Sequence, residues 1–331
     1  MAIDNVINEM NKKMKLGHLQ LGVDFRDVTK VPFSSPRLNY MLHGGLPLGR
    51  VCEFSGSEGS GKTTTALDML AQCQKLFPEK SVMYIDVEHT FDGNWASINR
   101  VDIDSILYFD PESASAESIF NTAYKVIDTG EVSLCVIDSI GAMVSDESTQ
   151  KEIGDRTYGG VSRALTDFSN RITPVLARTD TILIGINQLR DVMNSPYGGT
   201  RTIGGKAWKH ACTTRLEFRK GSYIDESGNA VSRAVENPSG NLVMVELVKS
   251  KVCAPDRKVG SYTLRYLTGI DYVSDLVDIA IKEDVIVQKG AWFYVLDDES
   301  LKFQGKPKLI AFLKENEDVY KRVYENLHLT D

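Results

Sequence analysis

VCEFSGSEGSGKTTTALDML, residues 51–70, is the stretch of sequence that decides the fold of this chain. It is typical of an apolar strand followed by a glycine-rich turn and a helix, and it contains the pattern G-x-x-x-x-G-K-T. Glycine tolerates positive φ angles, so backbone N–H groups in such a turn can surround a phosphate, and the following helix adds the positive end of its dipole. The pattern therefore predicts a phosphate-binding loop made of Gly56, Ser57, Glu58, Gly59, Ser60 and Gly61.

The residues that close this turn suit a nucleoside triphosphate. Lys62 can neutralise the β- and γ-phosphate oxygens, and the hydroxyl of Thr63 can bind the Mg²⁺ that bridges them. Thr64 belongs to the same predicted nucleotide site. The alternative is a glycine- and serine-rich loop without a ligand, but the strand before the turn and the helix after it favour binding of ATP and Mg²⁺.

Strand-like and helix-like runs alternate after this stretch, which is typical of a parallel sheet with crossover helices. Ser115 is a predicted helix N-cap, and Pro174 should bend the helix that contains it. Strands separated by turns follow from residue 213 and predict an antiparallel extension of the same sheet. The fold class is therefore α/β, a mostly parallel twisted sheet with flanking helices. The predicted strands are 81–86, 105–109, 134–139 and 181–188, and the predicted helices are 115–129 and 160–178.

Three parts of the chain are expected from this pattern. Residues 1–35 predict a helix from Ala2 to about Leu16 and a linker. The helix is too short to be stable alone, so it must dock on its own domain or on a neighbouring subunit. We expect this segment to serve in oligomerisation. Residues 36–268 predict the nucleotide-binding core. Residues 269–331 predict a small α/β domain with strands around 292–295 and one last helix over 306–327.

The composition is that of an ordinary globular protein of 331 residues with a net charge of −7. Residues 190–220 nevertheless contain seven basic and two acidic side chains, and such a local basic segment can attract phosphate groups. The chain has no apolar run long enough for a membrane span and no secretory signal, so we expect no membrane association and a cytoplasmic location. The five cysteines lack C-x-x-C spacing and should be buried, reduced thiols.

Polar residues close the predicted strands, and open α/β sheets bind ligands at the carboxyl ends of their strands. Asp138 follows four apolar residues, which is typical of the acid that binds Mg²⁺ opposite Thr63. Glu88, two residues after Asp86, can deprotonate a water aimed at the γ-phosphate and is the predicted general base. Gln188 suits a sensor of the γ-phosphate. A helix N-cap for Asp138 and a capping amide for Gln188 are the structural alternatives.

Two long glycine-containing connections, 145–160 and 189–205, start at these strand ends. Structureless connections of that length are commonly functional in compact domains. Their basic residues suit a nucleic-acid backbone, and their aromatic or apolar residues suit insertion between bases. A pair of solvated surface loops is the alternative. The basic candidates in or beside the connections are Arg163, Arg190, Arg201, Lys206 and Lys209, and the others are Tyr158, Met193 and Tyr197.

A series of motifs then follows in order along the chain: GSEGSGKTTTAL, YIDVEHTFD, LCVIDSIGAM, EIGDRTYGG, INQLR, TIGGKAWK, LVKSKVCAP and GAWFY. With these motifs the chain resembles the RecA-type recombinases, in particular their bacterial and phage branch, from about Leu38 to the C-terminus. The resemblance implies a RecA-like P-loop ATPase core with DNA-binding loops and a small C-terminal domain. Trp95 stands where the family usually has Tyr, His210 where it has Phe, and Lys206 where it has Asn.

The resemblance also implies roles for residues outside the phosphate-binding loop. Asp92 and Trp95 would lie at the adenine, with Tyr266 on its other side. Lys249 and Lys251, two apart on one face of a strand, would reach the ATP of the adjacent subunit. The implied DNA contacts include Tyr158, Gly159, Arg163, Gly204 and Gly205.

The implied activity is that of a DNA-dependent ATPase and recombinase. It would form helical filaments or rings on single-stranded DNA, pair that strand with homologous double-stranded DNA, and exchange strands in recombination and repair. Recombination mediators and single-strand-binding proteins are the expected partners, near the nucleoid or in a host cytoplasm if the chain is virus-encoded. The alternatives are a hexameric RecA-like helicase or motor, and a mediator that assembles other recombinases without exchanging strands.

Overall fold

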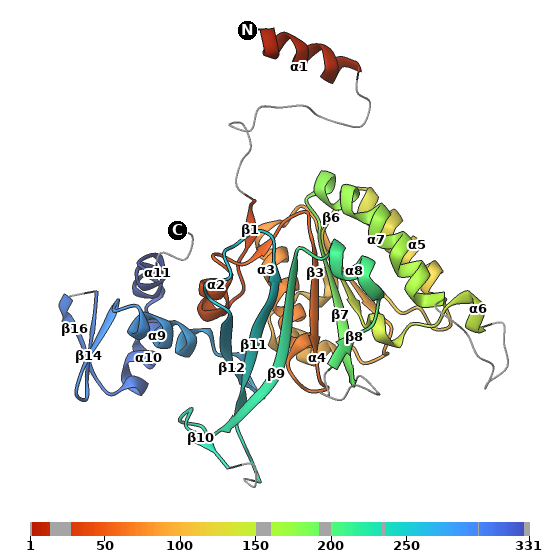
Figure 1. The fold of residues 1–331 in the computed structure, drawn as a ribbon. Coiled ribbons are helices and arrows are strands. Elements are labelled where there is room, and N and C mark those ends of the chain that lie inside the picture. The colour runs from red at the N-terminus through yellow and green to blue at the C-terminus, as the bar shows by residue number, and fades with distance from the viewer. Residues whose placement is uncertain are drawn as a thin grey trace.

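The computed structural model describes residues 2–13, 28–149, 160–191, 200–232, 236–296 and 298–327. These residues form a large α/β body, a smaller C-terminal lobe and an N-terminal helix that stands apart from both (Figure 1). The α/β class predicted from the sequence is confirmed. Within these ranges no helix has both the length and the apolar character needed to cross a membrane.

Strand β3 (Val51–Gly56) lies in the middle of the large sheet, whose order is β13-β12-β11-β9-β3-β7-β6-β4-β5. Every residue of β3 is buried, as expected for a strand covered on both faces. The pairings from β9 across β3 to β5 are all parallel. The other parallel strands on this side are β4 (Ser81–Asp86), β5 (Ile106–Phe109), β6 (Val132–Asp138) and β7 (Ile182–Asp191).

The antiparallel extension predicted beyond residue 213 is confirmed. Strand β9 (Thr214–Ile224) pairs in parallel with β3 on one side and antiparallel with β11 (Gly240–Ser250) on the other. Strand β12 (Val259–Arg265) continues the antiparallel part. The short strands β10 (Ala230–Val231) and β13 (Gly269–Ile270) pair with β9 and β12.

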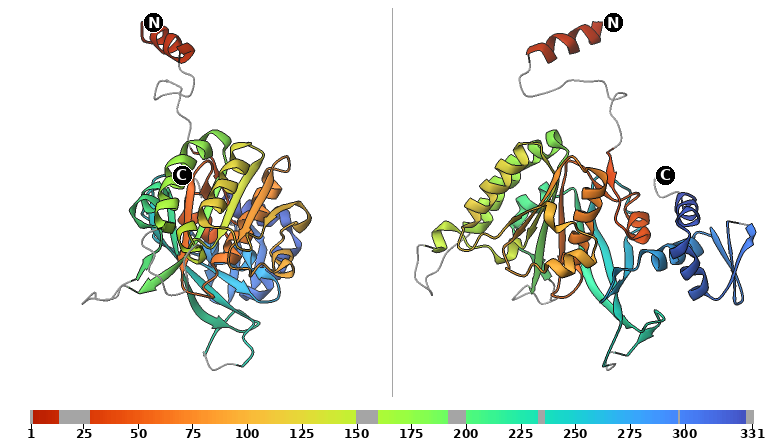
Figure 2. Two further views of the ribbon diagram at one scale, coloured as in Figure 1. Left: turned by 90° about the vertical axis from the view of Figure 1, so that its right-hand side faces the viewer. Right: turned by 180° about the vertical axis from the view of Figure 1, so that it is seen from behind.

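Helices cover both faces of the sheet (Figure 2), and a buried apolar cluster fills the layer on each side. One layer contains α3 (Lys62–Leu76), and the other contains α5 (Ala116–Asp128) and α7 (Gly160–Thr179). The side chain of Ser115 accepts a bond from the Ser118 N–H, which confirms the predicted N-cap. Helix α7 runs continuously through Pro174.

The C-terminal lobe has an apolar cluster of its own and a separate three-stranded sheet. The single last helix predicted over 306–327 is wrong, because two helices lie there. They meet at Asn316, whose backbone leaves the helical region (φ −123°, ψ 79°) while its side chain donates to the Phe312 carbonyl at 2.8 Å. The elements are α9 (Tyr272–Lys282), β14 (Ile286–Lys289), β15 (Trp292–Val295), β16 (Asp298–Gln304), α10 (Lys306–Glu315) and α11 (Glu317–Glu325).

The N-terminal helix α1 spans Ala2–Lys13, and the rest of its predicted length lies outside the described residues. It exposes Ile3, Val6 and Met10 by 56%, 49% and 43%. Four of the cysteines are buried, as predicted, but Cys253 is only half-buried. The remaining short elements are β1 (Lys30–Val31), α2 (Pro36–Met41), β2 (Leu46–Pro47), α4 (Gly93–Ile98), α6 (Asp146–Thr149), β8 (Thr200–Thr202) and α8 (Gly205–Ala211).

Candidate active site

Gly61 shows why the loop between β3 and α3 needs glycine. It caps α3 with a left-handed backbone at φ 99°, and a Cβ at this position would lie 2.8 Å from the hydroxyl oxygen of Tyr262. Any side chain here would therefore be strained. The buried Tyr262 ties the loop to β12, since its hydroxyl lies 2.8 Å from Thr65 Oγ1 and donates to the Gly61 carbonyl at 3.2 Å.

This loop lines a cleft of about 380 Å³ at the carboxyl ends of the parallel strands. Most of the lining residues come from the predicted nucleotide site. Ile186 and Leu189 of β7 are additions that the sequence did not single out. The lining residues are Gly56, Ser57, Glu58, Gly59, Lys62, Thr63, Glu88, Asp138, Ile186, Gln188 and Leu189.

Lys62 is held beside this cleft by neutral groups. Its Nζ donates to the backbone carbonyls of Gly56 at 3.1 Å and Ser57 at 2.7 Å. Burial lowers the pKa of Lys62, and the negative charges of Asp138 and Glu88 partly oppose that shift. An ammonium bonded to carbonyls can exchange them for phosphate oxygens, because charge-assisted hydrogen bonds are stronger than those to neutral acceptors.

Thr63 and Asp138 come together at the cleft from α3 and β6. Thr63 Oγ1 donates to Asp138 Oδ2 at 2.8 Å, and the hydroxyl of Tyr84 donates to the same oxygen at 2.8 Å. Burial raises the pKa of Asp138, and the two hydroxyl bonds oppose the rise because they stabilise the carboxylate. These hard oxygen donors fit Mg²⁺, which binds to few protein groups and keeps water and phosphate oxygens as its other ligands.

Glu88 and Gln188 are joined directly. Gln188 Nε2 donates to Glu88 Oε1 at 2.9 Å, and the hydroxyl of Ser139 donates to the same oxygen. The carboxylate is thus oriented within the cleft by two donors from neighbouring strand ends. The predicted base and the predicted sensor therefore lie in one hydrogen-bonded group.

The three residues implied at the adenine lie outside the lining of this cleft. Asp92 caps α4, and its carboxylate accepts two backbone N–H bonds from that helix. Trp95 Nε1 donates to Thr64 Oγ1 at 3.2 Å, which joins α4 to the start of α3. Tyr266 donates to Asn241 Oδ1 at 3.0 Å. Of these three residues, Trp95 is the one whose bond reaches the predicted phosphate end of the nucleotide site, at Thr64.

Lys249 lies on β11 and Lys251 follows its last residue, Ser250, and the side chains of both lysines reach the C-terminus of α8. Lys249 Nζ donates to the Lys209 carbonyl at 2.6 Å, and Lys251 Nζ donates to the His210 carbonyl at 2.9 Å. Cations at a helix C-terminus are stabilised by the unsatisfied carbonyls and the dipole. Burial lowers the pKa of Lys249, and the neighbouring charge of Lys251 lowers it further.

The DNA-binding candidates fall on several elements. Arg163 is exposed in the first turn of α7, Lys206 is exposed on α8, and Lys209 is half-buried there. Gly204 caps α8 with φ 107°, and Gly205 follows it with φ 67°. Arg190 and Arg201 are paired across the β7–β8 ladder. Tyr158, Gly159, Met193 and Tyr197 lie outside the described residues.

Neither connection is wholly structureless, which corrects the prediction. The first begins with the helix α6. In the second, β7 continues to Asp191 and pairs antiparallel with β8, so the base of the segment is a β-hairpin. At this base Leu189 lies opposite Thr202 and Asp191 opposite Thr200.

Glu53 is a buried residue that the sequence reasoning missed. Its Oε1 accepts from Asn187 at 3.0 Å and from Trp208 Nε1 at 2.9 Å, and its Oε2 accepts from Arg215 at 2.5 Å. Asn187 also donates to the Ile203 carbonyl at 2.8 Å. An acid inside an otherwise apolar strand was the available signal, because buried charges need partners. This group joins β3, β7, β9 and α8 next to the cleft.

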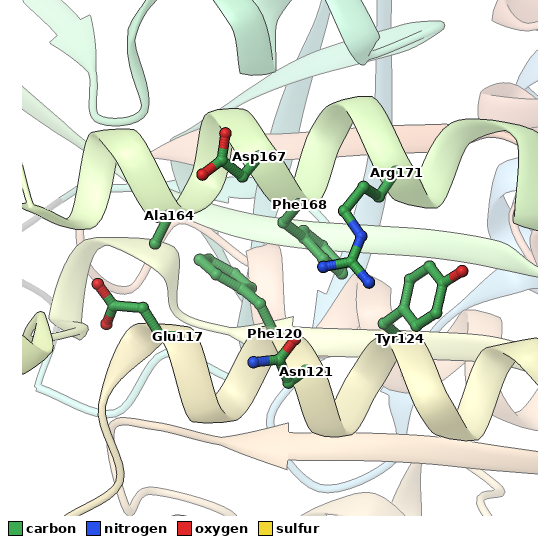
Figure 3. A pocket seen from close by; sticks show the side chains of 8 residues that line it. All are labelled: Glu117, Phe120, Asn121, Tyr124, Ala164, Asp167, Phe168 and Arg171. Carbon is green, nitrogen blue, oxygen red and sulfur yellow. The ribbon is translucent and has the colours of Figure 1, made fainter.

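A second cavity of about 150 Å³ lies between α5 and α7. Figure 3 shows Phe120 and Phe168 at its base, where their stacked rings lie 4.6 Å apart between centroids. The guanidinium of Arg171 lies 4.8 Å from the ring centroid of Tyr124 at one end. None of the site residues predicted above is in its lining, which is completed by Glu117, Asn121, Ala164 and Asp167.

A twisted parallel sheet with a phosphate-binding loop, a strand-end acid and an oriented glutamate defines a P-loop nucleoside triphosphatase. The class is narrowed further by comparison with known proteins. The family model of the RecA N-terminal domain matches residues 1–271, and that of the RecA C-terminal domain matches residues 274–328. The chain therefore belongs to the RecA family.

Individual relatives match almost the whole chain. The chain is 32% identical to Protein RecA of Lactobacillus acidophilus, covering 98% of this chain and 87% of that protein. It is 34% identical to Protein RecA of Ruminococcus albus, over 96% of this chain and 77% of that protein. It is 33% identical to Protein RecA of Frankia alni, over 98% of this chain and 91% of that protein.

Family membership confirms the predicted activity at the level of the class. The chain is an ATP-dependent recombinase of DNA recombination and repair, with the DNA binding, filament formation and DNA-dependent ATPase activity of its family. The helicase and mediator alternatives are not favoured.

Proposed function

We propose that ATP is hydrolysed in the cleft described above, with Glu88 as general base and Gln188 as the sensor of the γ-phosphate. The observation that carries this proposal is the 2.9 Å bond from Gln188 Nε2 to Glu88 Oε1. A γ-phosphate oxygen would compete for the same amide donor. When Gln188 turns to the phosphate, it leaves a carboxylate lone pair of Glu88 to accept a proton from water.

The other polar groups of the cleft would bind the phosphates. Lys62 would exchange the carbonyls of the loop for phosphate oxygens, and the loop amides would complete the anion site. Thr63 and Asp138 would hold Mg²⁺, which neutralises phosphate charge when it is bound. Ser139, which donates to Glu88, would keep the base in position while Gln188 moves.

The same glutamine would couple the nucleotide to DNA. Gln188 belongs to β7, and the hairpin that begins there returns through β8 to Gly204 at the start of α8. Asn187 donates to the Ile203 carbonyl at 2.8 Å, so both ends of the hairpin are connected beside the sensor. The proposed DNA surface consists of this hairpin and the adjoining residues, namely Tyr158, Gly159, Arg163, Arg190, Arg201, Gly204, Gly205, Lys206 and Lys209.

A neighbouring subunit would complete the nucleotide site. Lys249 and Lys251 extend toward the exposed end of α8, and they would leave its carbonyls for the phosphates of the adjacent protomer. Asp92, Trp95 and Tyr266 would surround the adenine. The exposed His210, at the same helix end, would lie at this subunit boundary.

Assembly would use the N-terminal segment, residues 1–35. The apolar side chains of α1 are exposed to solvent in the single chain. We propose that they pack into the cavity between α5 and α7 of a neighbouring copy (Figure 3). The acidic Glu117 and Asp167 at that cavity complement the basic Lys12 and Lys13 of α1.

Residues 36–268 would form the ATPase core and residues 269–331 a distinct domain. Mediators and single-strand-binding proteins would act on this filament in the cytoplasm.

Measurement of ATP hydrolysis with and without single-stranded DNA tests the proposal. The purified chain should hydrolyse ATP faster with the DNA, and Lys62→Ala should abolish hydrolysis in both conditions. Lys80→Ala is the matched control, because Lys80 also donates to a backbone carbonyl, that of Thr179, but at the far end of α7. Equal rates with and without DNA, together with nucleotide-independent DNA binding, would refute the proposed coupling.

A further inference from the structure

Tyr84 is a fully buried tyrosine whose hydroxyl contacts the proposed metal site. It lies on β4, which pairs in parallel with β6 so that Tyr84 is opposite Val136. Because side chains alternate along a strand, Asp138 points to the same face as Val136. The hydroxyl of Tyr84 donates to Asp138 Oδ2 at 2.8 Å, the oxygen that also accepts from Thr63.

We propose that Tyr84 is a positioning residue for Asp138, a role that rests on the proposed binding of Mg²⁺ by Asp138. Of the two donors to Oδ2, Thr63 is itself a proposed metal ligand, so the position of its hydroxyl would also depend on the metal. Tyr84 is not a proposed metal ligand. Its bond can therefore hold the carboxylate in one orientation whether or not the metal is present.

The surroundings of Tyr84 make its hydroxyl a fixed donor. The ring belongs to the buried apolar cluster on the α3 side of the sheet, and its centroid lies 5.0 Å from that of Phe91. A phenol on a packed ring has little freedom to leave its partner. It is also uncharged, so it orients Asp138 without adding a positive charge that would compete with a cation, as Lys or Arg would.

Tyr84→Phe tests this role, since the substitution removes the hydroxyl and keeps the packed ring. The binding of a fluorescent ATP analogue is measured as a function of Mg²⁺ concentration. Loss of a group that orients a metal ligand commonly weakens metal binding by 10- to 100-fold. We expect the Mg²⁺ concentration for half-maximal tight binding to rise by about tenfold, while analogue binding without Mg²⁺ stays unchanged.

Tyr108→Phe is the matched control. Tyr108 also donates from β5 to a strand-end carboxylate, Asp86 Oδ2 at 3.1 Å, which is not a proposed metal ligand. This variant should keep the wild-type Mg²⁺ dependence. If Tyr84 only stabilises the fold, Tyr84→Phe should have a lower melting temperature than the wild type and the same Mg²⁺ dependence. That outcome would contradict the positioning role.

Asp138→Asn separates the two hypotheses. If Asp138→Asn raises the Mg²⁺ requirement and Tyr84→Phe does not, the positioning role is refuted and the proposed metal site stands. If Asp138→Asn also leaves the Mg²⁺ dependence unchanged, the metal assignment fails, and the inference about Tyr84 fails with it. A shift in both variants, with Tyr108→Phe unchanged, supports the inference.

Discussion

Asp275→Asn is expected to stabilise the protein far more at pH 8 than at pH 5. Asp275 lies on α9 at the junction between the C-terminal lobe and the core, and its side chain is fully buried. One carboxylate oxygen accepts from Ser35 Oγ at 2.7 Å, and the other accepts from the Thr263 N–H at 3.1 Å. Asparagine can satisfy both partners, because its oxygen accepts from the amide and its NH₂ donates to the hydroxyl.

The magnitude follows from the pKa of the buried carboxyl. Burial raises the pKa of Asp275 from 3.8 to about 7, although the hydroxyl of Ser35 and the charge of Arg37 oppose the rise. The folded state therefore retains a proton that the unfolded chain has lost. The contribution of this retained proton to the free energy of unfolding is fully present below pH 3.8 and is lost as the pH rises to about 7. At about 1.4 kcal/mol per pH unit, this loss is about 3 kcal/mol between pH 5 and pH 8.

Chemical denaturation of the two proteins at pH 5 and pH 8 measures this effect. The difference in free energy of unfolding between Asp275→Asn and the wild type should grow by about 3 kcal/mol from pH 5 to pH 8. Ser35→Ala supplies a control, because loss of this donor should destabilise the aspartate form more at pH 8 than at pH 5. In the Asp275→Asn background that pH dependence should disappear. The same stability difference at both pH values would refute a protonated, buried Asp275.

Three further predictions concern the cleft and its supports. Glu88→Gln should slow single-turnover ATP hydrolysis by about 10²- to 10⁴-fold and preserve nucleotide binding, and hydrolysis at the wild-type rate would exclude Glu88 as the base. Trp208→Phe should lower the free energy of unfolding by about 1–3 kcal/mol in a denaturant titration, because Glu53 loses a buried donor; unchanged stability would contradict the importance of that bond. Lys249→Ala should have low DNA-stimulated ATPase activity alone. When it is mixed with Glu88→Gln, part of the activity should return, because a Glu88→Gln subunit supplies Lys249 to a neighbouring site whose own Glu88 is intact. No recovery in the mixture would argue against action across the subunit boundary.

The sequence by itself determined the nucleotide-binding loop and the parallel core. The reason is that these features have local causes. Glycines at fixed spacing make the anion-binding turn, and β4, β6 and β7 are largely apolar runs that lead into polar residues. Because the carboxyl ends of such strands meet at one edge, the amino-acid sequence alone predicts that Glu88, Asp138 and Gln188 lie close together.

Only the tertiary structure decided which partners these residues have. The bonds from Tyr84 to Asp138 and from Trp208 to Glu53 join residues 54 and 155 positions apart, and no local pattern encodes such a pairing. The same holds for Asp275, whose buried carboxyl meets Ser35 from 240 residues away. Hydrophobic packing of the sheet and its helices brings these groups together and removes water from them, and this burial raises the pKa values of Asp138 and Asp275.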